Sequence, residues 1–156
     1  MLNMPDFNGS SFKERIEYYY KISKLISCNS TTIIVLRCSY YGSVVNYYGA
    51  CSYIPPYYPN KLLGLDPEIE IVDPTGCGNA YLGALTAYIS QQNANTVNTI
   101  LNGCYYGSMA AALTLQQIGP FQVDNNMFND TSTIELFIEY GDSYSIVKKA
   151  FPQLFQ

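Results

Sequence analysis

The sequence predicts an α/β fold, and two stretches of the chain carry this prediction. An amphipathic, helix-like stretch at residues 12–27 leads into a continuous β-branched run at residues 31–36. Further along, a strand-like run at residues 68–72 breaks into glycines and then becomes helix-like. Helix followed by strand, and strand followed by helix, are the units of a wound sheet with helices packed on its faces.

The N-terminal half of the chain predicts one helix, one strand and one hairpin. Residues 1–10 are expected to form a flexible lead-in. Ser10 or Ser11 is expected to cap the first helix with Glu14 nearby, and apolar residues then recur at helical spacing. Residues 31–36 are typical of a strand buried on both faces. Residues 44–53 predict a hairpin that turns near Gly49-Ala50, and a proline-rich connection follows.

The C-terminal half predicts a strand at residues 68–72 and a mostly buried helix at residues 79–91. Thr96 is expected to cap the next helix, which should stop at Gly119-Pro120. Residues 131–140 and 142–150 predict two short terminal helices. Residues 11–156 are therefore expected to form a single, partial domain.

Composition and charge exclude several classes of function. The net charge of −4 and the few scattered cations disfavour direct binding to a nucleic-acid backbone. No apolar run approaches the roughly 18 residues of a membrane span. The five cysteines are scattered without a C-x-x-C motif, which favours reduced thiols and a cytoplasmic location. The absence of histidine removes Ser-His-Asp catalysis, Cys-His catalysis and histidine metal sites.

The glycine-rich turn at residues 73–79 predicts an anion site. Pro74 cannot extend a strand ladder, while Gly76 and Gly78 let a ligand approach the main chain without meeting a Cβ. The helix that follows presents unpaired N–H groups and the positive end of its dipole. The stretch lacks the Lys-Ser/Thr ending of a P-loop, and Tyr81 stands where a dinucleotide fingerprint has its third glycine. The turn therefore suits a phosphate or a developing oxyanion, although it matches neither of these two phosphate-binding motifs.

The run Asp73-Pro74-Thr75-Gly76-Cys77-Gly78-Asn79 closely resembles the second signature of the pfkB-type, or ribokinase-like, carbohydrate kinases, Asp-Thr-x-Gly-Ala-Gly-Asp. The resemblance covers about residues 31–120 and implies the C-terminal portion of a ribokinase-like three-layer αβα sandwich. It implies an anion hole for the transferred phosphoryl group at Gly76, Cys77 and Gly78. It also implies a monovalent-cation site that includes Asp73 and Thr75.

Asn79 departs from the family pattern at the catalytic position. The resemblance places there the aspartate that removes the proton from the sugar hydroxyl, whereas an amide can only orient that hydroxyl. The Pro-Thr-Gly-x-Gly-Asn version resembles a divergent fungal branch of the family, the maintenance-of-killer proteins. Phosphoryl transfer is therefore expected to be impaired.

Two further stretches resemble nucleotide-binding parts of the family. Residues 37–45 resemble a Thr-x-Gly-x-x-Gly turn, with Arg37 in place of the Thr, Ser39 in place of the first glycine and Gly42 as the second. Arg37 has two interpretations, an ion pair at a strand end or a bidentate phosphate contact. Residues 107–113 resemble the helix beside the adenine, with Ser108 near the usual Asn; close packing of small residues is the alternative.

The expected function is that of a carbohydrate kinase-like domain that binds ATP phosphates, with Mg²⁺ and, as a further candidate, K⁺. The expected ligands are a nucleotide and a sugar or nucleoside acceptor. A catalytically silent pseudokinase that acts as a scaffold is the alternative, with a protein partner or a homodimer.

Overall fold

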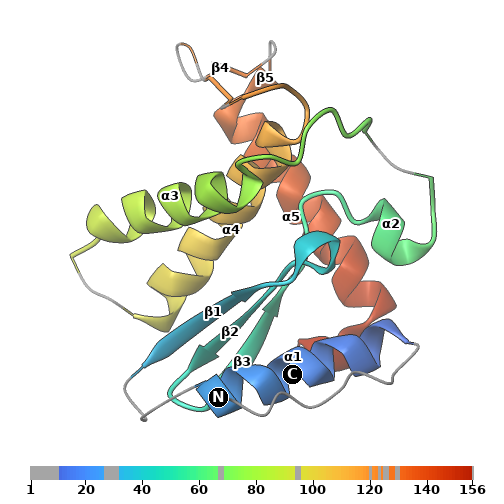
Figure 1. Ribbon diagram of the computed structural model, residues 1–156, viewed down its shortest axis with the longest axis vertical. Helices are drawn as coiled ribbons and strands as arrows, with labels where there is room; N and C mark the ends of the chain where they lie inside the picture. The colour runs from blue at the N-terminus through green and yellow to red at the C-terminus, as the bar shows by residue number, and fades with distance from the viewer. Residues whose placement is uncertain are drawn as a thin grey trace.

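The computed structural model describes residues 11–26, 32–66, 69–93, 96–119, 121–122, 124, 127–128 and 131–155 (Figure 1). The predicted lead-in at residues 1–10 lies outside this described part. The elements, in chain order, are α1 (Phe12–Ile26), β1 (Ile33–Arg37), η1 (Ser39–Tyr41), β2 (Ser43–Tyr47), β3 (Ala50–Ile54), α2 (Asn60–Leu63), α3 (Cys77–Ser90), α4 (Val97–Thr114), β4 (Met127–Phe128), β5 (Thr131–Ser132), α5 (Thr133–Ala150) and η2 (Pro152–Leu154).

The main sheet is antiparallel and has the strand order β1-β2-β3. Its β2–β3 hairpin confirms the predicted one. The two turn residues are Tyr48 and Gly49, with φ of 52° and 87°, and Tyr47 pairs with Ala50 across the hairpin. Positive φ at both turn positions is the geometry of a type I′ turn, whose twist matches that of the flanking strands.

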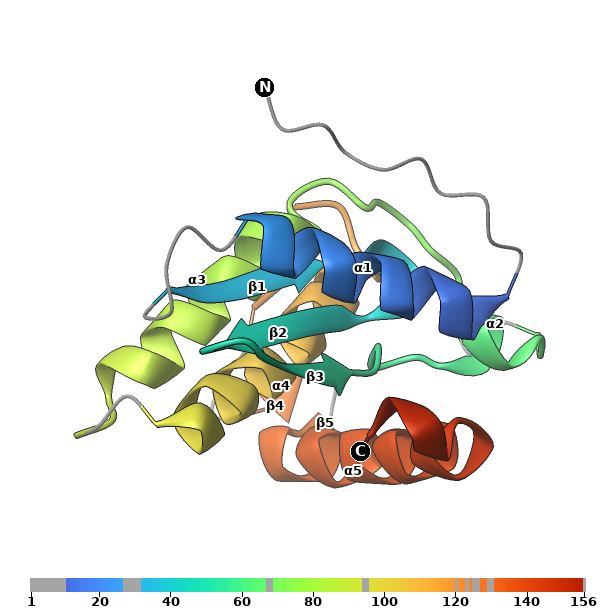
Figure 2. The same ribbon diagram turned by 90° about the horizontal axis from the view of Figure 1, so that it is seen from below.

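Helices cover both faces of this sheet, which confirms the predicted αβα layering (Figure 2). Side chains of consecutive residues point to opposite faces of a strand, and β2 shows this directly. Val44 belongs to the apolar cluster that holds Ile16 of α1. Val45 belongs to the cluster that holds Tyr81 of α3 and Cys104 of α4.

Helix α5 closes the β3 side of the molecule (Figure 2). The Tyr140 hydroxyl donates to the Pro55 carbonyl at 2.6 Å, and the Tyr57 hydroxyl donates to the Leu136 carbonyl at 3.0 Å. The two rings are stacked with centroids 5.3 Å apart. The two short terminal helices predicted for residues 131–150 are thus wrong, because one helix runs through Gly141 and is held along its length.

Helices α3 and α4 pack closely because glycines remove side chains from their contact. A Cβ on Gly107 would lie 3.0 Å from Tyr81 Cδ1, and one on Gly103 would lie 2.7 Å from Leu85 Cδ1. The small residues of α4 therefore serve helix-to-helix packing. Helix α4 ends at Thr114, earlier than the predicted stop at Gly119.

One predicted strand and two predictions of burial are wrong. Residues 69–72 form no strand, and Ile71 and Val72 are 56% and 52% exposed, since the main chain here bonds to the end of α4 and not to a sheet neighbour. Helix α3 buries only Tyr81 and Leu85 and leaves Leu82 about half exposed. β1 is partly exposed because it is an edge strand.

The start of α5 carries a complete capping box. Ser132 Oγ accepts from the Glu135 amide at 3.1 Å, and Glu135 Oε2 accepts from the Ser132 amide at 2.9 Å. Replacing Ser132 by alanine removes the acceptor for a first-turn amide and is expected to lower the free energy of unfolding by about 0.5–2 kcal/mol. Urea denaturation would measure this loss. A Ser145→Ala variant, at an exposed interior position of the same helix, should change stability by less.

Candidate anion-binding site

The glycine turn lies between the end of α4 and the start of α3 (Figure 1). The amides of Val72 and Asp73 donate to the Leu115 carbonyl at 2.8 Å and 3.3 Å, which fixes the entry of the turn. Gly76 is the N-cap of α3 with φ of 87°, in the left-handed region that favours glycine, and no side chain caps the helix.

The first turn of α3 leaves amide groups for a ligand. The Cys77 amide bonds weakly to the Pro74 carbonyl at 3.3 Å, and the Ala80 amide bonds to the Gly76 carbonyl at 2.9 Å. The amides of Gly78 and Asn79, which lie between them, have no hydrogen-bond partner among the described residues. Unpaired first-turn amides together with the helix dipole form a site for an anion.

Arg37 reaches this turn from the end of β1. Its Nη1 donates to the Gly78 carbonyl, and an added Cβ on Gly78 would lie 2.6 Å from Nη1. Because Gly78 has no Cβ, the guanidinium fits beside the first turn of α3. Arg37 forms no ion pair within the described part of the chain, and both interpretations of this residue stay predictions. A guanidinium carries five N–H donors in a fork, and the residue is exposed, so donors remain for an anion.

Asn79 is exposed at the same end of α3. Its neighbour Cys77 is partly buried, and desolvation, followed by the negative charge of Asp73, raises the pKa of the thiol. The thiol is therefore protonated at neutral pH. It adds no negative charge that would repel an anion from the turn.

The two cation-site candidates, Asp73 and Thr75, lie together at the entry of the turn. Asp73 Oδ1 accepts from the Thr75 amide at 2.8 Å. This bond, with a second one from the Thr75 hydroxyl, holds the pKa of the Asp73 carboxyl below its usual range. The carboxylate is thus ionised at neutral pH. No cluster of three His, Cys, Asp or Glu side chains suited to a metal occurs among the residues that the structure describes.

Ser39 and Gly42 lie in the turn that follows Arg37. Ser39 has φ of 56°, a conformation that favours glycine and occurs here at the position matched to the first glycine of Thr-x-Gly-x-x-Gly. Gly42 has φ of 89°, and a Cβ there would overlap the Ile54 carbonyl oxygen and lie 2.9 Å from the Pro55 carbonyl carbon. Packing alone therefore accounts for glycine at position 42.

Ser108 lies apart from the glycine turn. It is only 7% exposed on α4 and hydrogen-bonds the buried phenol of Tyr140. This setting supports the packing alternative for the small residues of α4. The assignment of Ser108 to nucleotide binding stays a prediction.

Tyr81 supports the site from below, and the sequence analysis did not select it for this role. Its phenol lies 2.9 Å from the hydroxyl of Ser43, the first residue of β2, in a buried setting, and also hydrogen-bonds Cys104 of α4. The phenol thus ties the start of α3 to the sheet and to α4. The only sequence feature that indicates this role is the hydroxyl at position 81 within an apolar helix, and its partners are far away in the sequence.

Replacing Tyr81 by phenylalanine is expected to lower the free energy of unfolding by about 1–3 kcal/mol, because the buried Ser43 hydroxyl loses a partner. Denaturant unfolding of Tyr81→Phe, Ser43→Ala and the double variant checks this. The double variant should lose less stability than the sum of the two single variants. Additive losses would contradict a shared bond.

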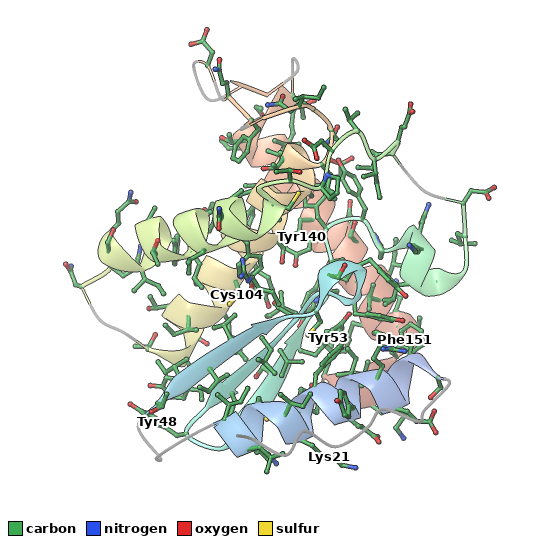
Figure 3. All side chains as sticks on the ribbon, viewed as in Figure 1. Lys21, Tyr48, Tyr53, Cys104, Tyr140 and Phe151 are labelled. Carbon is green, nitrogen blue, oxygen red and sulfur yellow. The ribbon has the colours of Figure 1, made fainter. Side chains whose placement is uncertain are left out.

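The side chains around the sheet can be followed in Figure 3, where Tyr53 and Cys104 point into the layers on either side of it.

None of the helices in the described part of the chain is long and apolar enough to cross a membrane.

Among the comparisons with known proteins, only the one with solved structures finds matches, and it identifies the fold of this chain. No family model matches the chain, and no curated protein matches it. Two crystal structures of fructokinase from Vibrio cholerae, one a double mutant with fructose, ADP and potassium ion and the other with fructose, ADP and calcium ion, match 86% of this chain at 17% identity and a TM-score of 0.52. A nucleoside kinase from Methanocaldococcus jannaschii, an archaeal member of the ribokinase family, matches 85% at 13% identity and a TM-score of 0.49.

The chain spans 36% of the length of the fructokinase chains that it matches. The strands and helices nevertheless superpose over most of the chain, and the layering agrees with the prediction made from the glycine signature. The chain therefore has an α/β, ribokinase-like fold.

Proposed function

We propose that this chain is a carbohydrate kinase-like domain that binds the phosphates of ATP at residues 76–79. The single observation that carries the proposal is the placement of the Arg37 guanidinium beside the Gly78 carbonyl. This contact lies next to two first-turn amides that have no hydrogen-bond partner among the described residues. A cation and a helix N-terminus that converge on one exposed turn provide charge and directed donors for a phosphate.

The proposed site divides into parts with different tasks. Gly76, Cys77 and Gly78 form the anion hole, and Arg37 supplies a charged contact to the phosphate. Ser39 and Gly42 belong to the site through the turn that follows Arg37. Asp73 and Thr75 would hold a cation such as K⁺, and Mg²⁺ would accompany the phosphates. Bound Mg²⁺ would neutralise charge during transfer to a sugar or nucleoside hydroxyl.

Asn79 determines how well this domain can catalyse transfer. Its amide can hold an acceptor hydroxyl but cannot take up the proton, and general-base catalysis contributes roughly 10²–10⁴-fold. The proposed transfer is therefore slow, and the signature resembles that of the divergent fungal maintenance-of-killer-like branch. The same observation favours a second candidate function, that of a catalytically silent scaffold that still binds nucleotide.

Replacing Arg37 by glutamine tests the anion site. The charge-assisted contact with phosphate is worth about 1.5–3 kcal/mol, so the affinity for ADP with Mg²⁺ should fall roughly 10–100-fold. Isothermal titration calorimetry measures this. Lys24→Gln removes one exposed cation in the last turn of α1 and should bind ADP as the unchanged protein does.

Two outcomes would contradict the proposed site. Equal ADP affinity in Arg37→Gln and Lys24→Gln would remove Arg37 from it. No detectable ADP binding by the unchanged protein would leave a fold without this ligand. Gly78→Val is less informative, because the new side chain would displace Arg37 as well as any ligand.

A further inference from the structure

The peptide group between Gly78 and Asn79 has its two polar ends in different surroundings. Its C=O, on Gly78, accepts a hydrogen bond from Arg37 Nη1. Its N–H, on Asn79, has no hydrogen-bond partner among the described residues. Because a trans peptide is planar, its C=O and N–H point in opposite directions. A side chain that fixes the direction of the carbonyl therefore fixes the direction of the amide as well.

Arg37 holds a helix start that lacks a capping side chain. Helices α4 and α5 begin with side-chain caps from Thr96 and Ser132, whereas no side chain caps α3. The first turn of a helix has few hydrogen bonds of its own. A carbonyl oxygen has two lone pairs, so Gly78 can accept the bond from Arg37 in addition to its helical bond. The constraint that a cap gives the other two helices thus comes to α3 from the end of β1.

The charge of Arg37 also changes the strength of the amide at the far end of this peptide. A guanidinium keeps its charge at every relevant pH, so its bond to the Gly78 carbonyl is charge-assisted. A hydrogen bond to one end of a peptide polarises it and strengthens the bond at the other end. The Asn79 N–H is therefore a better donor to an anion than an amide of the same turn without such a contact.

We propose that Arg37 is a positioning residue of the anion site, which orients and polarises the main-chain N–H of Asn79 toward the bound phosphate. The inference rests on the proposed function, which supplies the phosphate. It gives Arg37 a role through the peptide that a direct contact with phosphate does not include. Nη1 serves the carbonyl, and the other donors of the guanidinium remain for the phosphate.

Nuclear magnetic resonance of the ¹⁵N-labelled protein without ligand tests the first half of this role. Arg37→Gln removes the charged donor from the Gly78 carbonyl, so the ¹⁵N resonance of the Asn79 amide should move as its peptide becomes less polarised. Lys24→Gln, which removes a cation from the last turn of α1, should leave that resonance in place. An Asn79 resonance that is the same in Arg37→Gln and in the unchanged protein overturns the proposal.

A double-mutant cycle tests whether Arg37 acts on the ligand through the peptide. In Gly78→Ala the added Cβ would lie 2.6 Å from Nη1, so it should displace the guanidinium from the carbonyl and leave the charge in the protein. The affinity for ADP with Mg²⁺ should fall roughly 3–10-fold, the effect of one hydrogen bond. The double variant Arg37→Gln/Gly78→Ala should bind as Arg37→Gln does, because both changes remove the same contact.

Gly83→Ala is the matched control for the cycle. It makes the same change in the same helix, and an added Cβ there has no neighbour within 4 Å, so it should bind ADP as the unchanged protein does. Additive losses in the double variant would mean that the methyl group blocks the ligand independently of Arg37, and would overturn the positioning role. Full ADP affinity in Gly78→Ala would overturn it as well.

The two experiments separate this inference from the proposed function. If the unchanged protein binds ADP but the losses are additive, the positioning role fails and the proposed function stands. If the unchanged protein binds no ADP, the proposed function fails, and the role toward a phosphate fails with it. The resonance of Asn79 is measured without ligand and without a change at Gly78, so it remains decisive if Gly78→Ala does not fold.

Discussion

Replacing Asn79 by aspartate is expected to raise the rate of phosphoryl transfer from ATP by roughly 10²–10⁴-fold, because a carboxylate at this position can accept the proton of the attacking hydroxyl. Asn79 is exposed at the first turn of α3, where a carboxylate is also compatible with the helix dipole. The measurement is ADP release with Mg²⁺ and K⁺ over a panel of sugars and nucleosides. The affinity for ADP should change far less than the rate.

Asn98 provides the matched control for this variant. It is exposed in the first turn of α4, so Asn98→Asp makes the same change at another helix start and should leave ADP release at the level of the unchanged protein. Equal rates for Asn79→Asp and Asn98→Asp, with ADP bound, would contradict the role of position 79 and favour the silent scaffold. ADP binding without turnover in any variant would favour it as well.

Replacing Gly42 by alanine is expected to destabilise the protein by about 3 kcal/mol or more, the largest effect on stability expected of a single methyl group here. The backbone has φ of 89° at this position, and the added Cβ would overlap the Ile54 carbonyl oxygen at the end of β3. Left-handed strain alone costs of order 1–3 kcal/mol. The overlap adds to this cost, since main-chain atoms cannot rotate away as a side chain can. Thermal and denaturant unfolding would measure the loss.

Gly49 separates these two contributions. It has φ of 87°, almost the same as Gly42, but an added Cβ would have no neighbour within 4 Å. Gly49→Ala should therefore cost only the strain, and the difference between the two variants measures the overlap. Equal losses would show that β3 moves aside. The turn after Arg37 would then be more adaptable than its packing indicates.

Patterns that involve neighbouring residues predicted the structure well. The Ser11–Glu14 capping pair, the Thr96 cap and the β2–β3 hairpin all occur where the sequence indicates them. In each case residues within a few positions determine the local geometry, through a side-chain cap or a turn that requires positive φ. The fold class followed from the helix-to-strand order of residues 12–36 and from the family that the glycine signature resembles, although the strand expected before that signature does not form.

Features that depend on distant contacts were not predicted. Residues 69–72 have the composition of a strand, yet no strand of the described chain lies beside them. Their side chains are exposed because no neighbouring strand covers them. The sequence left two interpretations of Arg37, and neither included its contact with the Gly78 carbonyl across 41 positions. The bond between Tyr81 and Ser43 spans 38 positions, and no local pattern pairs these two residues.

The Leu115 carbonyl, which receives the amides of Val72 and Asp73, joins the glycine turn to the end of α4, while Arg37 joins it to the end of β1. Opening of the turn from α4 breaks the first two bonds, and opening of the turn from the sheet breaks the third. The turn therefore links the helical layer to the sheet in local unfolding. A ligand that binds the turn and Arg37 would, by linkage, slow both openings.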